Sequence, residues 1–542
     1  MMPVYAVILF IMFTGCLKKE KADLILVNGK VYTVDSVFSI KESFAVVDGL
    51  IVATGNNEEI SGAYETDLII DANGKPVYPG FNDGHCHFYG YATSHYLGVN
   101  LRGTGSFDEI QSLLQDFHQR HPNAWILGTG WDQNDWEIKD FPDKSKLDEL
   151  FPETPVVLTR IDGHAVLANQ AALSVAGLDK DTKIPGGKLL LKNGQLTGIL
   201  LDNAADLMKG MTPKPVDDDK KKALIMAQKE CFGLGLTSVS DAGLDYHEIL
   251  MIDSLQQSEK LKLRINAMLS PTDLNLKEFV GKGTFRKDRL TVNSIKLYAD
   301  GALGSRGGLL LEPYSDDPGN YGIRMSEPDY YRDILTLAYE KGFQVNTHCI
   351  GDSANRLMLM LYGEVLTGHN DRRWRIEHAQ VIHPDDFELF GKFSIIPSVQ
   401  STHCTSDMYW AGDRLGVERI KGAYAYKELL NQNGWLINGT DFPIEELNPL
   451  LTFYAAVARK DIKGYPEGGF QMENSLCRED ALRSMTIWAA KGSFEENIKG
   501  SIEEGKVADF VILDKDIMDI DETKIPTVKV LKTYLNGELV FE

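Results

Sequence analysis

The chain of 542 residues predicts an α/β fold, a TIM-like (β/α)8 barrel that carries a small β-sandwich domain and an inserted subdomain. Eight short apolar runs alternate with helix-like segments through the middle of the chain, and polar residues that suit a metal stand at the ends of several runs. Alternating strands and helices form a parallel sheet, and eight such units close into a barrel. Both chain ends contain short β-rich runs, which predict the β-sandwich domain.

The first segment, residues 1–21, contains an unbroken apolar run from Val4 to Phe13, then Thr-Gly-Cys16 and a lysine-rich stretch. Ten residues are too few to span about 30 Å of hydrocarbon, but they suit the apolar region of a signal peptide. Phe-Thr-Gly-Cys resembles a bacterial lipobox, so we expect lipidation of Cys16 and an exported lipoprotein, held at the periplasmic or outer-membrane face. No Lys or Arg precedes the run, so a buried N-terminal strand or a misassigned start is the alternative, with a cytoplasmic protein.

Residues 22–75 and 500–542 read as short strands joined by turns. Asn-Gly and Asp-Gly between β-rich runs are typical of hairpin turns. We therefore expect the two ends to form one composite β-sandwich domain. The turns are at Asn28-Gly29, Asp48-Gly49 and Asn536-Gly537.

Residues 76–499 are predicted to form the barrel. Its eight strands are expected at 77–85, 235–241, 261–269, 292–300, 342–348, 373–378, 393–399 and 434–441. Helices are expected between most of them, for example at 328–341, 352–366 and 424–433. The roughly 140 residues between the first and second strands far exceed a usual connection, which predicts an inserted subdomain at about 90–225.

Composition excludes several classes of protein. A formal charge of -22 and a pI near 5.0 disfavour nucleic-acid binding, which needs a basic surface. The six cysteines are scattered without a CxxC pair, so neither a disulfide framework nor a zinc knuckle is indicated. A hydrophobic fraction of 43% is ordinary for a globular protein. These features favour a soluble chain of catalytic size.

The sequence His85-Cys86-His87 ends the first predicted strand. On an extended strand, residues i and i+2 project from the same face, so both imidazoles can reach one ion. Two surface histidines at this spacing are common, so the pair alone is weak evidence. Its weight comes from the residues that end or occupy later strands: Lys296, His348, His378 and Asp441.

Each of these later residues has an ordinary alternative. A lone lysine is usually at the surface or ion-paired, a lone histidine can be a hydrogen-bonded core residue, and Asp441 could cap a helix. The carboxyl ends of barrel strands meet at one mouth, however, so together these residues predict a single polar centre. Burial lowers the pKa of a lysine, and neutral Lys296 could react with carbon dioxide to give an anionic carbamate that bridges two metals.

Longer phrases resemble the amidohydrolase superfamily, specifically its amidohydrolase-3 group of YtcJ-like and N-substituted formamide deformylase-like proteins. The phrases are PGFNDGHCHF (79–88), GLTSVSDAG (235–243), IKLYADGALGSRGG (295–308), VNTHCIGDSAN (345–355), RIEHAQVIHPDD (375–386), SVQSTHCTSDMYWAGDRLGVERIKGAY (398–424), INGTDFPIEELNPL (437–450) and GSIEEGKVADFVILD (500–514). The resemblance implies one or two divalent metals, with zinc expected. By it, His85, His87 and Asp441 hold the first metal, His348 and His378 hold the second, and carboxylated Lys296 bridges them.

The resemblance also implies a reaction. Metal-activated hydroxide would attack the carbonyl of a small amide, formamide or cyclic amide, and Asp441 would pass the proton to the departing nitrogen. The expected reaction is hydrolysis of a carbon–nitrogen bond other than a peptide bond. Alternatives are a lactonase, esterase or phosphotriesterase-like activity at the same centre, or a non-catalytic binding or regulatory protein on the same fold. Such non-catalytic relatives usually lack ligands, and none is missing here.

The remaining expectations concern the pocket and the partners. Substrate-binding residues are expected among Trp131, Asp132, His164, Arg306 and His403, with packing or surface positions as an equally weighted alternative. The expected partner is a small-molecule substrate, with no nucleic acid and no membrane contact except through the lipid anchor. A homodimer is left open.

Overall fold

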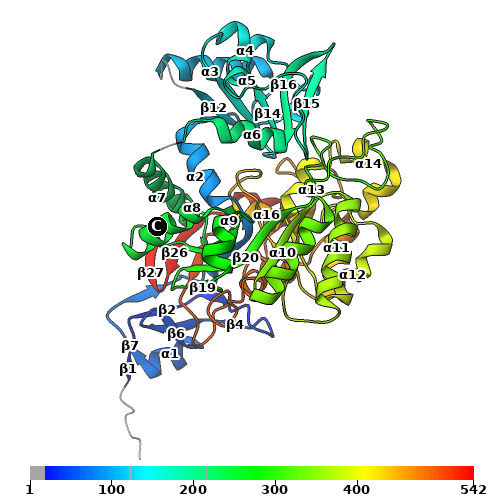
Figure 1. Cartoon of the computed structure of the whole chain (residues 1–542). Coiled ribbons are helices and arrows are strands. Elements are labelled where there is room, and N and C mark those ends of the chain that lie inside the picture. Colours follow the sequence, from blue (N-terminus) through cyan, green and yellow to red (C-terminus); the bar gives the residue numbers. More distant parts are fainter. Residues whose placement is uncertain (1–18, 121–124, 215) are drawn as a thin grey trace, which may run out of the picture.

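The computed structural model describes residues 19–120, 125–214 and 216–542 (Figure 1). It confirms the predicted fold class: eight parallel strands follow one another in chain order around a nearly closed barrel. The segment with Cys16 lies outside the described residues. The barrel strands are β10 (Phe81–Cys86), β17 (Leu236–Leu244), β18 (Arg264–Leu269), β20 (Leu290–Tyr298), β21 (Gln344–Cys349), β22 (Arg375–His378), β23 (Ile396–Val399) and β24 (Ile437–Asn438).

The barrel closes where the eighth strand meets the first. The backbone N–H of Asp441 donates to the carbonyl of His85 at 2.8 Å, and the N–H of His87 donates to the carbonyl of Phe442 at 2.8 Å. A Cβ at Gly439 would lie 2.5 Å from the nitrogen of His85, so only glycine allows this approach. β24 is shorter than the predicted 434–441 because Asp441 turns out of extended geometry with φ 62°. This turn places Asp441 beside the two histidines.

Helices between the strands cover the outside of the barrel (Figure 1). α10 (Pro328–Lys341) has proline in its first turn and ends at Gly342, whose φ of 75° stops the helix. The predicted bounds of α10 and α11 (Asp352–Leu366) are confirmed, while α15 (Tyr426–Asn433) starts later than predicted because Tyr424 has φ 54°. Other helices of the barrel region are α8 (Tyr246–Gln257), α12 (Phe387–Lys392), α13 (Ser401–Asp407), α14 (Ala411–Arg419), α16 (Pro449–Ala458), α17 (Arg478–Ser484) and α18 (Ile487–Gly492).

The insert stands over the barrel as a separate lobe, at the top of Figure 1. α2 (Phe88–Leu97) leads into it and α7 (Asp217–Gly233), which packs against α2, leads back. Its six-stranded sheet has the order β11 (Val99–Asn100), β12 (Ile126–Trp131), β13 (Val156–Arg160), β14 (Ala165–Ala168), β16 (Gln195–Asp202) and β15 (Gly187–Lys192). Its helices are α3 (Phe107–Arg120), α4 (Ser145–Leu150), α5 (Gln170–Val175) and α6 (Asn203–Met211), and it has hydrophobic clusters of its own.

Strands from both chain ends build two further sheets. One has the order β6 (Leu50–Gly55), β5 (Ser43–Val47), β2 (Leu24–Val27) and β8 (Ile69–Asp71). The other has the order β27 (Glu538–Phe541), β26 (Val530–Leu535), β25 (Phe510–Leu513), β9 (Pro76–Pro79), β3 (Lys30–Tyr32) and β4 (Ile40–Lys41). One hydrophobic cluster joins the two sheets, with Phe44 packed edge-on against Phe510. Among the described helices, none combines the length and apolar character that a membrane crossing requires.

Candidate metal centre

The six residues predicted to form the centre come together at the mouth of the barrel. His85 is in β10, Lys296 in β20, His348 in β21 and His378 in β22, while Asp441 follows β24. All of these side chains are buried, and His87, next to β10, is partly exposed. The rings of His85 and His378 have centroids 5.0 Å apart, and those of His348 and His378 are 4.5 Å apart.

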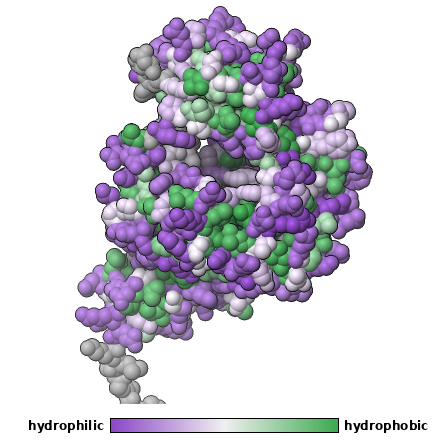
Figure 2. All heavy atoms as spheres, viewed as in Figure 1, coloured by the Kyte–Doolittle hydropathy of each residue, from purple (hydrophilic) through white to green (hydrophobic). Residues whose placement is uncertain are grey.

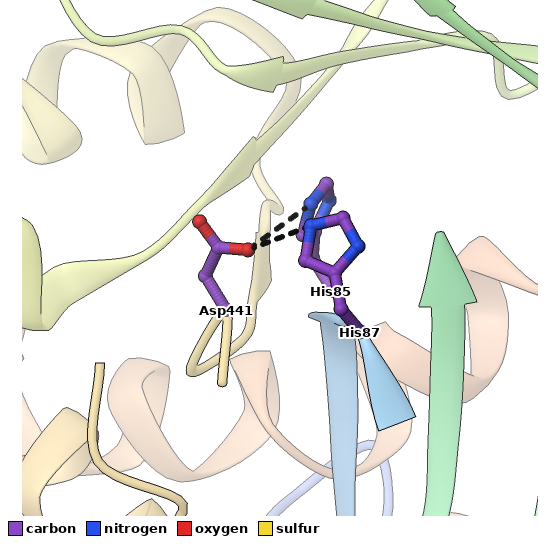
Figure 3. Close-up of side chains that lie close together, drawn as sticks. All are labelled: His85, His87 and Asp441. Carbon is purple, nitrogen blue, oxygen red and sulfur yellow. Dashed lines mark ion pairs between the residues drawn. The ribbon is translucent and has the colours of Figure 1, made fainter. Parts of the chain in front are cut away.

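One group of atoms within this cluster, from His85, His87 and Asp441, lies close enough together to hold a metal ion. Oδ1 of Asp441 lies 3.5 Å from Nε2 of His85 and 3.3 Å from Nε2 of His87 (Figure 3). Nδ1 of His87 must donate, because its partner at 3.1 Å is the carbonyl of Ala242. Nδ1 of His85 donates to Glu377 at 2.6 Å.

In the neutral imidazole form, which is the form that binds metals, both Nε2 atoms would present lone pairs to this carboxylate oxygen. Oδ1 of Asp441 has no hydrogen-bond partner among the described residues. Burial, and then the nearby Lys296, lower the pKa of His85, which keeps it neutral. Three acceptors that converge in this way fit a divalent cation.

A second set of imidazoles borders Oδ2 of Asp441. Nδ1 of His378 lies 4.0 Å from this oxygen, is buried, and has no hydrogen-bond partner within the described chain. Burial holds the pKa values of His378 and His348 well below the usual range, so both are neutral. Nε2 of His348 faces the carbonyl of Gly301 at 3.4 Å, which leaves Nδ1 of His348 as its acceptor.

Lys296 lies between the two sets. Its Nζ is 3.3 Å from Nε2 of His85 and 5.0 Å from the ring centroid of Tyr298. The side chain is almost fully buried, and this burial lowers the pKa of Lys296 to about 8. At this pKa about one-tenth of the side chain is neutral near pH 7 and about half near pH 8, and the neutral amine is the form that a carbamate requires.

Asp441 and His403 form a hydrogen-bonded pair beside the cluster. Nε2 of His403 donates to Oδ2 of Asp441 at 3.2 Å, and Nδ1 of His403 donates to Glu445 at 2.9 Å. Burial alone would raise the pKa of Asp441, but the hydrogen bond from His403 and the other neighbouring histidines together outweigh it and hold that pKa well below the usual range. Burial alone would lower the pKa of His403, but its two carboxylate partners raise it well above the usual range.

Sequence reasoning missed Glu377, which lies one residue before His378. Glu377 is fully buried and orients His85 through Nδ1, as carboxylates commonly orient metal-bound histidines. Its other oxygen lies 3.8 Å from Arg375, which is itself fully buried and donates to the carbonyl of Gly84 at 3.2 Å. The sequence could have pointed to Glu377, because Arg375 and Glu377 are charged residues at i and i+2 of a predicted barrel strand, where apolar residues are expected.

The proposed pocket residues have different environments. Trp131 is packed in the core of the insert, with its indole N–H donated to the carbonyl of Leu158 at 2.9 Å. Asp132 forms an ion pair with Arg160, and Arg306 forms one with Asp316 at 2.9 Å. Among the described residues, none of these three forms a hydrogen bond or ion pair with the histidine cluster.

His164 and His403 do reach the cluster. The ring of His164 lies 5.0 Å from that of His348, and the ring of His403 lies 5.9 Å from that of His378. His403 approaches from α13, after the seventh barrel strand, while His164 approaches from the insert. Figure 2 shows a hollow between the insert and the barrel.

Residues 68–541 match the model of the amidohydrolase family. The chain belongs to this family. The family predicted from the sequence phrases is thereby confirmed.

Relatives match along almost the whole chain. Protein LONG AFTER FAR-RED 3 of Arabidopsis thaliana is 34% identical, covering 96% of this chain and 92% of that protein. YtcJ of Bacillus subtilis (strain 168), named as an amidohydrolase, is 33% identical, covering 95% and 98%. N-substituted formamide deformylase of Arthrobacter pascens is 25% identical, covering 96% and 99%.

A solved structure supports the same conclusion. An uncharacterized metal-dependent hydrolase from Pyrococcus horikoshii OT3 superposes with a TM-score of 0.74 at 29% identity, covering 92% of this chain and 99% of that one. The chain therefore shares its overall fold with a solved relative that is described as a metal-dependent hydrolase.

Proposed function

We propose that this protein hydrolyses a carbon–nitrogen bond other than a peptide bond, in an amide, formamide or cyclic amide of a small molecule. The observation that carries the proposal is the convergence of two imidazole lone pairs and Oδ1 of Asp441 at the mouth of the barrel. The likeness to N-substituted formamide deformylase over nearly the whole chain favours a formamide or related amide.

His85, His87 and Asp441 would hold one metal; His348 and His378 would hold a second, with Lys296 as a carbamate between them. A divalent metal supplies an activated water and a Lewis acid for the carbonyl oxygen. Zinc is the metal that this imidazole and carboxylate set suits best.

The proton transfer is assigned to Asp441. Oδ2 of Asp441 is held at 3.2 Å by His403, so the carboxylate keeps one orientation toward the centre. In that position it can accept the proton of the attacking water and return it to the departing nitrogen, which must be protonated to leave.

The test combines metal content with a substrate screen. Purified protein is analysed for bound metal and assayed on N-formyl amines, N-acyl amines, cyclic amides, esters and lactones. We expect bound zinc and turnover of an amide or formamide. Preferred turnover of an ester or lactone would contradict the assignment to carbon–nitrogen bonds.

Asp441→Asn tests the role of the carboxylate. It keeps the shape and one oxygen but removes the base, so turnover should fall at least about 100-fold while metal content stays near normal. Asp352→Asn is the matched control, because Asp352 is also buried and follows a barrel strand but accepts a hydrogen bond from Leu311. Near-normal turnover of Asp441→Asn on a good substrate would assign the proton to another residue, with His403 next.

A further inference from the structure

We propose that His164, carried by the insert, contacts the substrate, and that Asp202 is the residue that positions it. The insert would then supply part of the active site. The inference rests on the proposed function, because it needs a substrate at the metal centre.

His164 lies at the interface between the insert and the barrel mouth. It stands in the short connection between β13 and β14, where its backbone N–H donates to Oδ1 of Asp162 at 3.0 Å. Its ring is 5.0 Å from that of His348, and its side chain is 14% exposed. The ring of His164 therefore lies beside the histidine cluster and keeps some access to solvent.

Asp202 fixes the orientation of this imidazole. Oδ1 of Asp202 accepts the Nδ1–H of His164 at 2.9 Å, and the backbone N–H of Asp202 donates to the carbonyl of His164 at 2.7 Å. Two bonds between one pair of residues leave the ring little freedom. Nε2 of His164 remains available, since no residue in the described ranges forms a hydrogen bond with it.

Three local features of Asp202 are unfavourable for an aspartate: its backbone angles, its missing capping bond and its buried oxygen without a partner among the described residues. Its φ of 53° and ψ of -122° are in a region that glycine adopts easily and other residues rarely do. It occupies the N-cap of α6, a position that favours aspartate, yet its side chain makes no capping bond. Its Oδ2 is buried, and no described residue hydrogen-bonds to it.

The barrel is shaped to receive the same carboxylate. A Cβ at Gly301 would lie 2.3 Å from Oδ1 of Asp202, and a Cβ at Gly307 would lie 3.0 Å from Oδ2. Both glycines are in the loop that follows β20, and the carbonyl of Gly301 faces Nε2 of His348. The His164–Asp202 pair and the histidine cluster therefore share one supporting loop.

Local conflicts of this kind are expected where function, and not stability, selects a residue. Alternatively, Asp202 could only anchor the insert to the barrel. The two interpretations, positioning of His164 and anchoring of the insert, predict different effects of Asp202→Gly on stability and activity. Glycine suits the backbone angles and removes a buried oxygen without a partner, so the melting temperature should hold or rise, while His164 loses its orientation.

The experiment compares Asp202→Gly with Asn193→Gly. Asn193 is an exposed residue in the turn between β15 and β16 of the insert and has the same φ of 53°, but it forms no hydrogen bond with His164 among the described contacts, so it controls for the backbone effect. We expect both variants to keep the wild-type melting temperature or exceed it. Only Asp202→Gly should lose kcat/KM, by at least tenfold, with normal metal content.

His164→Ala should lose at least as much kcat/KM as Asp202→Gly, and His164→Gln should recover part of it through its terminal amide. Wild-type kcat/KM in Asp202→Gly or His164→Ala would overturn the proposal. So would an activity loss in Asp202→Gly that merely follows a lowered melting temperature.

If wild-type protein hydrolyses none of the screened compounds, the proposed function fails, and binding then decides the role of His164. The affinity of zinc-loaded protein for acetohydroxamic acid is measured by calorimetry. A loss of at least fivefold in His164→Ala supports contact with the ligand, and an unchanged affinity overturns it.

Discussion

Replacing Glu377 with glutamine should weaken zinc binding although Glu377 is not among the expected ligands. The residue accepts the Nδ1–H of His85 at 2.6 Å in a fully buried pair, so the hydrogen bond is short and assisted by charge. Glutamine keeps an acceptor but loses the charge that makes Nε2 of His85 a stronger ligand. Loss of such a partner typically lowers metal affinity about 10–100-fold, which corresponds to about 1.4–2.7 kcal/mol.

Glutamine also leaves Arg375 without its carboxylate, so stability must be measured separately from metal affinity. The Arg375–Glu377 separation is 3.8 Å and both side chains are fully buried. Breaking a buried pair by removing one partner costs about 3–5 kcal/mol, whereas replacing both partners by apolar groups is often neutral. The double variant Glu377→Gln with Arg375→Met should therefore recover apo-protein stability without recovering zinc affinity.

Zinc affinity is measured by competition with a chelator, and apo stability by denaturant unfolding. Glu495→Gln is the control, because Glu495 is also buried but pairs with Lys499 at 2.7 Å, outside the metal centre. It should lower stability and leave zinc affinity unchanged. Wild-type zinc affinity in Glu377→Gln would refute the reasoning, since it would mean that the orientation of His85 does not depend on this carboxylate.

Two further predictions concern Lys296 and Cys16. With a pKa of about 8, Lys296 is only about one-tenth neutral near pH 7, so activation of metal-free protein by zinc and bicarbonate should increase as the pH rises through about 8. Lys296→Ala should lose the second metal, and short carboxylic acids should restore part of its activity. Activation of wild-type protein that does not depend on pH, or full activity of Lys296→Ala, would argue against a carbamate. We also propose from the sequence that Cys16 is lipidated, so Cys16→Ser should leave the membrane fraction; an unchanged distribution and mass would refute this.

The fold was predictable because its signal is repetitive. Each barrel strand is a short apolar run, and each following helix carries its own start and stop, such as Pro328 and Gly342 around α10. The boundaries were less accurate where a single residue leaves regular geometry. Tyr424 and Asp441, with φ of 54° and 62°, shorten a helix and a strand in ways that apolar periodicity does not record.

The candidate site was only partly predictable, and the reason is distance along the chain. His348, His378 and Asp441 were found because strand ends of a parallel barrel always meet at one mouth. Trp131 and His164 looked equally eligible in sequence, because both belong to the insert. Only the packing of the insert on the barrel puts His164 beside His348 and leaves Trp131 in a separate core.

Strained backbone gathers at this mouth for a common reason. Asp441 and His378, at φ of 62° and 71°, and Asp202 at 53° are buried and lie around one centre, unlike the turn residues that usually accept such angles. Strain of this kind costs on the order of 1–3 kcal/mol per residue and persists only where the surroundings impose it. A ligand that binds only the folded chain offsets such costs, by about 4 kcal/mol at a thousandfold excess over its Kd. The strain, the convergent acceptors around Asp441 and the unpartnered oxygen of Asp202 are therefore best explained together, as the geometry of a protein shaped to hold a metal and a substrate.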